Sequence, residues 1–258
     1  MQFFKNVWET LVTYHSLLLE GLGYTMLIAL TGTVIGLIIG IIMGIIRTIP
    51  RGKSGFGRVV QKVGNFIISA YVEIFRGTPM MVQAMVIFWG YAFIAGGNTL
   101  PLVPAGIFIV SINTGAYMTE IVRGGIISID KGQFEGAHAV GMTHFQTMFH
   151  VIIPQVMRNI LPSVSNEFVI NIKDTSVLNV IGVMELFYQA EKIQSMNLQI
   201  FETYVIICVI YFIMTFAVTR ILRFFEKKLS GKKNYVICGS QSDPAAEIRV
   251  MEDEGDVR

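Results

Sequence analysis

The sequence predicts an all-α integral membrane protein with five transmembrane helices. Hydrophobic residues occupy 53% of the 258 positions, charged residues only 15%, and the mean hydropathy is +0.59. These values lie far from those of an ordinary soluble domain. Crossing a hydrocarbon core of ~30 Å takes roughly 17 to 25 apolar residues as a helix. Five segments reach that length, at about 22–46, 63–95, 104–123, 156–181 and 200–221.

Residues 1–21 precede the first span and predict an amphipathic helix in the membrane interface. Phe4, Trp8 and Leu11 recur at helical spacing among Lys5 and Glu9. One face of such a helix is apolar and the other polar, which is typical of helices that lie on a bilayer. The segment lacks the uninterrupted apolar core and small-residue cleavage site of a signal peptide.

The second apolar segment, 63–95, is longer than one span and contains Gly77-Thr78-Pro79. Proline lacks the backbone N–H that a helix interior needs, and its ring collides with the preceding turn. We therefore expect either one kinked span or a span followed by a shorter re-entrant helix.

Basic residues predict the orientation of the chain. The linker 47–62 has five basic residues and no acidic one, and the segment 220–233 has six more. Lysine and arginine accumulate on the cytoplasmic side of membrane proteins, so both segments are expected there. The segments around 96–103 and 182–199 have few basic residues and are expected outside. The N-terminus is then outside and the C-terminus in the cytoplasm.

The tail, residues 231–258, loses apolar periodicity and ends in the acidic run MEDEGDVR. This composition predicts disorder. Cys208 and Cys238 give neither a disulfide framework nor a metal-ligand spacing, and we expect no metal site. The net charge of +2 follows from the basic residues beside the spans, so it does not indicate a nucleic-acid partner.

The segment 128–154, between the third and fourth spans, is too polar to cross a bilayer. Its ionisable side chains are Asp130, Lys131, Glu135, His138, His144 and His150.

Two helix starts are predicted within this segment. Asp130 with Gln133 and Thr143 with Gln146 have the spacing of capping boxes. Gly141 between them permits the left-handed backbone that ends a short first helix, and the second helix is expected to run to Pro154. The two helices would form a rigid turn on the cytoplasmic surface.

Glu135-Gly136-Ala137 is followed at fixed spacing by Gly141 and by Val151 to Pro154. This pattern resembles the EAA motif of ATP-binding-cassette importer permeases, with Gly136 in place of the usual alanine. In that family the motif forms a coupling helix that docks on a separate ATPase. The resemblance implies an ATPase-coupling role for the following residues: Gln133, Glu135, Gly136, Ala137, Gly141 and Pro154.

Three further stretches, 71–79, 113–121 and 161–176, are similar to polar-amino-acid permeases of the histidine and glutamine uptake type. With the EAA-like segment they cover about residues 20 to 230. The resemblance implies a type I importer fold, a permease domain over 22–230, an amino-acid substrate and a location in the cell membrane of a prokaryote. It also implies three kinds of protein partner: ATPase subunits that bind ATP and Mg, a second permease copy or homologue, and an extracytoplasmic substrate-binding protein.

Polar side chains inside the spans are the candidates for a substrate path. A charge at the bilayer centre costs at least ~2.5 kcal/mol, so such groups are expected to face the bundle interior. A guanidinium can receive a carboxylate through two hydrogen bonds, and a carboxylate can receive an ammonium group. The candidates are Glu73, Arg76, Thr78, Asn113, Thr114, Glu167, Lys173 and Asp174.

Structural alternatives exist for several of these residues. Glu73 and Arg76 are three apart on one helix, as are Glu120 and Arg123, so each pair could simply neutralise itself. Asn113 and Thr114 could equally be helix-packing residues, a common use of small and polar side chains in membranes.

The chain itself is not expected to be an enzyme or to bind a cofactor. Gly52-Lys53-Ser54 resembles part of a phosphate-binding loop, but Arg47 stands where that motif needs its first glycine, and no strand precedes it. ATP hydrolysis is therefore expected on a partner. The alternative functions are an ion-coupled secondary transporter or a channel subunit. The first would be expected to repeat its halves, and the second leaves the segment 128–154 unexplained.

Overall fold

The computed structural model describes residues 2–49, 55–229, 235–238 and 247–250. The fragment Gly52-Lys53-Ser54 and part of the two basic segments lie outside these ranges. The described helices are α1 (Gln2–Thr13), α2 (His15–Thr48), α3 (Gly55–Gly77), α4 (Met80–Ile94), α5 (Leu102–Ile127), α6 (Lys131–Ala139), α7 (His144–Thr147), the π-helical turn η1 (Met148–Ile152), α8 (Ile153–Asp174), the 3-10 turn η2 (Thr175–Ile181), α9 (Leu186–Asn197) and α10 (Ile200–Leu229).

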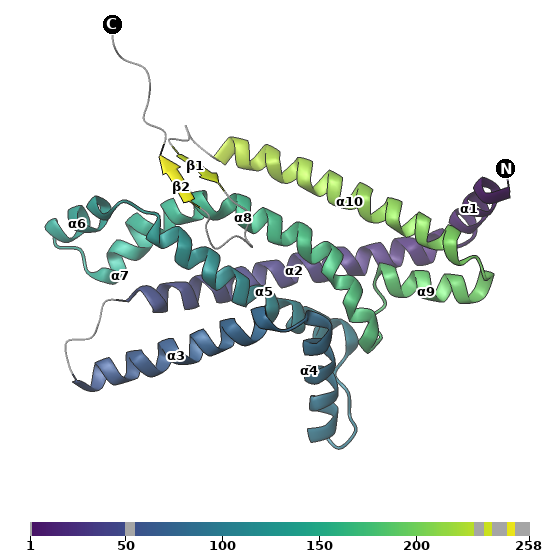
Figure 1. The fold of residues 1–258 in the computed structure, drawn as a ribbon, viewed down its shortest axis with the longest axis horizontal. Coiled ribbons are helices and arrows are strands. Elements are labelled where there is room, and N and C mark those ends of the chain that lie inside the picture. Colours follow the sequence, from purple (N-terminus) through teal and green to yellow (C-terminus); the bar gives the residue numbers. More distant parts are fainter. Residues whose placement is uncertain (1, 50–54, 230–234, 239–246, 251–258) are drawn as a thin grey trace, which may run out of the picture.

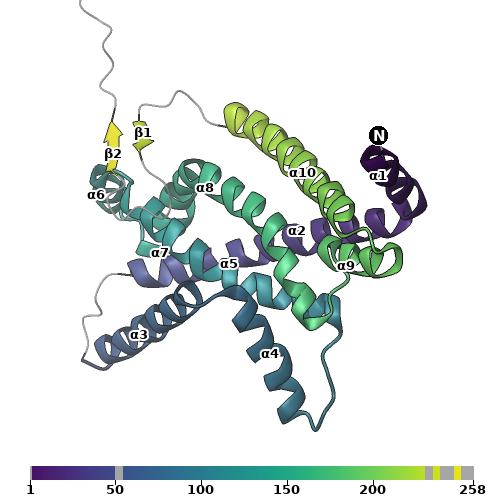
Figure 2. The same cartoon turned by 45° about the vertical axis from the view of Figure 1, so that its right-hand side comes forward.

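The long helix α2 runs through the centre of the bundle, with α5 packed along it (Figure 1). Helices α1 and α9 lie at one end, beside the start of α10. The short helices α6 and α7 lie at the other end, where α2 ends and α3 begins. Figure 2 shows α4 pointing away from the other helices. The described parts of both predicted basic segments, 47–49 with 55–62 and 220–229, thus lie toward the end that carries α6 and α7.

Glycines on one face of α2 allow the close contact with α5. Gly32, Gly36, Gly40 and Gly44 are four residues apart, so they lie in one row along the helix. A Cβ atom at Gly40 would lie 2.4 Å from the Cβ of Met118 on α5. Without side chains in this row, the two backbones approach more closely than larger residues would permit.

Three described helices, α2, α5 and α10, are long and apolar enough to cross a membrane. Helices α3 and α4 meet the same criterion only together, and they are bent by 113° at the break between Gly77 and Met80. The expected fourth span, 156–181, corresponds to α8 and η2. It does not meet the criterion because α8 contains several charged and amide side chains. The number of five spans stays a prediction.

The first 21 residues are not one helix. Helix α1 ends at Thr13, and α2 begins at His15, well before the expected start of the first span at 22. The side chain of Thr10 is buried, and its hydroxyl donates to Gln199 Oε1 at 2.9 Å. Asn6 donates to Glu202 Oε1 at 3.0 Å. These contacts with the start of α10 hold α1 at an angle to α2.

Disorder was predicted over 231–258, and the two segments of this tail that the structure describes are short strands; for the rest of the tail, disorder stays a prediction that lies outside the described residues. β1 (Tyr235–Cys238) pairs with β2 (Glu247–Val250) in an antiparallel sheet. Both strands contain β-branched residues, which favour extended backbone. The acidic end of the tail, which suggested disorder, lies beyond both strands.

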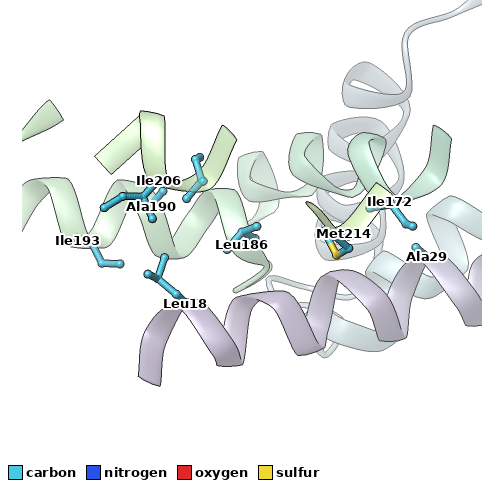
Figure 3. Close-up of a cluster of buried hydrophobic side chains, with 9 residues drawn as sticks. Leu18, Ala29, Ile172, Leu186, Ala190, Ile193, Ile206 and Met214 are labelled. Carbon is cyan, nitrogen blue, oxygen red and sulfur yellow. The ribbon is translucent and has the colours of Figure 1, made fainter. Parts of the chain in front are cut away.

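Buried side chains form three clusters along the bundle. Figure 3 shows the first, which lies near the end that carries α1. In it, Leu18 of α2, Ala190 of α9 and Ile206 of α10 belong to one buried apolar cluster. The second packs α4 and η2 against α5. The third joins α5, η1 and α8 at the opposite end.

Candidate functional site

A cavity of about 760 Å³ opens between α3, α5 and α8, at the break that separates α3 from α4. Six of the eight candidate path residues line it: Glu73, Arg76, Thr78, Asn113, Glu167 and Asp174.

The helix break is stabilised by an amide side chain that the sequence analysis did not single out. Helix α3 ends before Pro79, so carbonyl groups of its last turn lack helical donors. The Gln83 amide donates to the carbonyl oxygen atoms of Phe75 and Thr78, both at 2.9 Å. Asn113 of α5 in turn donates to Gln83 Oε1 at 2.9 Å. The break is thus held by hydrogen bonds from α4 and α5.

Arg76 is the guanidinium in the cavity, and it lies over the ring of Tyr117 with 5.4 Å between Cζ and the ring centroid. Such a contact between a cation and an aromatic face is attractive. In the described part of the chain, no nitrogen–oxygen contact within 4.0 Å joins Arg76 to Glu73. The two side chains therefore do not neutralise each other as an ion pair.

The second pair does form an ion pair. Arg123 contacts the Glu120 carboxylate at 2.7 Å, and Arg47 of α2 also donates to that carboxylate. Glu120 and Arg123 therefore neutralise each other, which is the structural role considered for them from the sequence.

Helix α8 contributes two carboxylates to the cavity wall. Glu167 is 5% exposed, and Asp174, two turns further along the same face, is partly buried. With Glu73, the cavity contains three carboxylates and one guanidinium. Groups of both charges can therefore meet a ligand there.

Two candidate path residues do not line the cavity. The Thr114 hydroxyl donates to Asn171 Oδ1 at 3.1 Å, and the Asn171 amide donates to the Thr33 hydroxyl at 2.8 Å. Thr114 therefore joins α5 to α8 and α2, as the packing alternative expected. Lys173 is exposed and is not among the residues that line the cavity, unlike its neighbour Asp174.

Other polar residues of the cavity were missed. Tyr117 lies one helical turn after Asn113, and Asn166 and Asn171 flank the face of Glu167 on α8. Tyr117 and Asn171 each lie four residues after a candidate, Asn113 and Glu167 respectively, so helical spacing was the signal that could have found them, although neither is charged.

The turn between α6 and α7 has the predicted glycine conformation. Gly141 has φ +81°, which non-glycine residues rarely adopt. Thr143 and Gln146 form the expected capping box, with hydrogen bonds of 3.3 and 2.8 Å. Asp130 caps α6 by accepting from the Gly132 N–H at 2.6 Å.

Two expectations for this segment were wrong. Gln133 does not complete a capping box with Asp130, because its Oε1 accepts from Gln155 of α8 at 3.3 Å. The second helix does not end at Pro154 but continues through η1 into α8. The Ile153 N–H bonds to the Met148 carbonyl five residues back. This wider turn comes directly before Pro154, where the missing N–H and the ring are tolerated near a helix start.

The α6–α7 turn is anchored on one side and exposed on the other. Met148 and Ile152 pack against Val122 and Ile126 of α5. On the opposite side, Val140, Phe145 and Phe149 are 77%, 67% and 47% exposed, and the two phenyl rings lie 4.4 Å apart. We call these three side chains the turn surface. Of the predicted coupling residues, Glu135 and Gly136 are exposed beside it and Ala137 is buried.

His144 lies at the start of α7, next to the turn surface. Burial lowers the pKa of its imidazole, and the nearby His138 lowers this pKa further. Its Nε2 atom is buried and makes no hydrogen bond within the described part of the chain. The charged form of His144 is therefore disfavoured at this position.

Comparison with known families decides what kind of protein has this architecture. Residues 36–231 match the family of binding-protein-dependent transport system inner membrane components. The chain belongs to this family of transport permeases.

Individual relatives of this permease are transport proteins for amino acids. It is 42% identical to the L-cystine transport system permease protein TcyB of Bacillus subtilis over 165 residues, which cover 64% of the chain and 70% of TcyB. It is 37% identical to the glutamine transport system permease protein GlnP of Escherichia coli K12 over 179 residues, which cover 68% of the chain and 81% of GlnP.

A solved structure shares the fold of the permease. A crystal structure of an amino acid ABC transporter with histidines is similar with a TM-score of 0.71 and 36% identity. The similarity covers 84% of this chain and 96% of that one. The predicted type I importer fold in a cell membrane is confirmed, and a secondary transporter or channel is excluded. Membership of this family implies an ATPase and a substrate-binding protein as partners.

Proposed function

We propose that this permease forms the path of an ATP-driven amino-acid importer, in which the cavity at the α3–α4 break contacts the substrate. The main support is that this cavity contains a guanidinium and three carboxylates beside a helix break. An amino-acid zwitterion has a carboxylate and an ammonium group, and the cavity has a partner for each. The substrates in the names of the relatives, cystine and glutamine, are of this class.

In this proposal Arg76 binds the substrate carboxylate. Its fork of N–H groups suits two parallel hydrogen bonds to a carboxylate. The ammonium group would lie toward Glu73, Glu167 or Asp174. Gln83 keeps the break open by occupying the carbonyl groups of Phe75, in the last turn of α3, and Thr78, in the break itself.

The α6–α7 turn is the proposed contact with the ATPase. Its exposed apolar surface is suited to a protein partner, and its buried side links it to α5 and α8. A movement of the ATPase would therefore reach the helices that line the cavity. ATP and Mg would bind to the ATPase alone. The remaining partners are a second copy of the chain or a homologue, an extracytoplasmic binding protein and membrane lipid, with no nucleic acid.

This function is tested by copurification followed by reconstitution. An ATPase should copurify with the chain, and the complex in proteoliposomes should take up radiolabelled amino acid when the loaded binding protein is supplied. Losing charge-assisted hydrogen bonds costs about 1.5–3 kcal/mol, so Arg76→Gln should reduce uptake at least about tenfold.

Arg158→Gln is the matched control, because Arg158 is exposed on α8 and does not line the cavity. It should retain normal uptake. Normal uptake in a well-expressed Arg76→Gln protein would show that the cavity is not the path. Absence of a copurifying ATPase would contradict the coupling role of the turn.

A further inference from the structure

A second cavity, of about 580 Å³, lies where the ends of α2 and α5 meet α3 and the start of α6. Three basic side chains line it, one each from α2, α5 and α6: Arg47, Arg123 and Lys131. No acidic residue is among its lining residues. It is separate from the proposed substrate cavity, with which it shares no lining residue.

One carboxylate holds the two guanidinium groups in place. Glu120 accepts hydrogen bonds from both Arg47 and Arg123. Arg47 also donates to the Ser69 hydroxyl of α3 at 3.4 Å. A guanidinium has five N–H donors, so these contacts fix its orientation without using all of them. The three basic side chains and the Glu120 carboxylate together have a net charge of +2. The two guanidinium groups are held in position by Glu120 without any ligand.

The rest of the cavity wall is of two kinds. Ser69, Thr48 and Asn65 provide polar groups, and the Asn65 Oδ1 atom is buried without a hydrogen-bond partner in the described residues. Ile127, which is 65% exposed, and Phe134 provide an apolar side. An inorganic anion would leave this apolar side unused, whereas a lipid has a charged headgroup and an apolar chain.

We propose that this cavity binds the phosphate headgroup of an anionic phospholipid, with an acyl chain along Ile127 and Phe134. Basic pockets between transmembrane helices on the cytoplasmic side suit such headgroups. The guanidinium groups of Arg47 and Arg123 would receive the phosphate oxygens. A hydroxyl group of a glycerol headgroup would donate to Asn65 Oδ1.

Binding there would link the α6–α7 turn to the spans. Lys131 and Phe134 belong to α6 and Ile129 to the link before it, whereas the other lining residues belong to α2, α3 and the end of α5. A phosphate held between Lys131 and the two arginines therefore fixes the start of α6 relative to the bundle. ATP turnover by the complex should then depend on lipid charge.

The test is a lipid titration of the purified permease–ATPase complex by native mass spectrometry. Dioleoylphosphatidylglycerol should bind more tightly than dioleoylphosphatidylcholine. One basic residue contributes about 1 kcal/mol to binding of an anionic membrane surface, so Lys131→Gln should weaken the first phosphatidylglycerol binding step about fivefold. Lys62→Gln is the control, since Lys62 is exposed on α3 outside the cavity, and it should leave that step unchanged.

A second variant distinguishes a lipid from free phosphate. Ile127→Ser should weaken phosphatidylglycerol binding while leaving all three cations in place. Equal binding of the two lipids, or equal loss in Lys131→Gln and Lys62→Gln, would overturn the proposal. So would displacement of phosphatidylglycerol by millimolar inorganic phosphate together with unchanged lipid binding in Ile127→Ser, because a soluble anion would then be the ligand.

Discussion

The close contact between α2 and α5 makes Gly40 the position where one methyl group should be most damaging. In Gly40→Ala the new Cβ would lie 2.4 Å from the Met118 Cβ and 2.7 Å from the Met118 backbone carbon. Carbon atoms in contact are ordinarily about 3.5–4.0 Å apart. The helices would have to separate by roughly 1 Å, because a backbone atom cannot rotate away as a side chain can.

Overpacking of this kind costs about 1–3 kcal/mol. For a chain of this size the corresponding loss in Tm is about 2–4 °C per kcal/mol. Gly40→Ala should therefore lower the Tm of the detergent-purified permease by about 2–12 °C, measured by intrinsic fluorescence or by a thiol-reactive dye.

Gly23→Ala is the matched control on the same helix. No atom lies within 4 Å of the Cβ that it would introduce, and alanine is favoured over glycine in a helix by roughly 0.5–1 kcal/mol. Its Tm should be unchanged or higher. If Gly40→Ala were as stable as Gly23→Ala, the glycine row would not be what allows α2 and α5 to approach.

The other predictions concern the turn, the cavity and the orientation. Gly141→Val should reduce transport in a normally expressed protein, because valine rarely adopts φ +81°; unchanged uptake in proteoliposomes would contradict this. The double variant Glu73→Gln with Arg76→Gln should not recover the uptake lost in Arg76→Gln, since the two side chains form no ion pair; recovery would favour a purely structural pair. With the native cysteines replaced, Asn98→Cys should react with an impermeant thiol reagent from outside and Gly136→Cys only from the cytoplasm; the reverse pattern would invert the topology.

Charge was the reason that much of the cavity could be predicted from sequence. Glu73, Arg76, Glu167 and Asp174 stand in otherwise apolar segments, where the cost of an ionised group in lipid directs it to the interior. Gly141 was predictable for a similar reason, since few residues other than glycine end a helix with a positive φ.

Contacts between distant segments account for what the sequence did not predict. The sequence around Gln83 does not mark it as special, because the carbonyl groups of Phe75 and Thr78 come within its reach only through the break at Pro79. Gln133 had the spacing of a capping residue, yet Gln155 of α8 lies close enough to bind its side chain instead. A local sequence pattern cannot predict which hydrogen bond such a side chain makes, because its partner lies on another helix whose relative position the pattern does not contain.

The π-helical turn η1 determines the direction in which the turn surface faces. A π turn contains about one residue more than an α turn, and each residue advances a helix by roughly 100°. Removing one residue from Met148–Ile152 would therefore rotate Phe145 by about that angle relative to α8, although Phe145 itself would be unchanged. Two permeases that share Val140 and Phe145 but differ by one residue in this π-helical turn would present these side chains to different sides, and under the proposed coupling they would require differently placed ATPases.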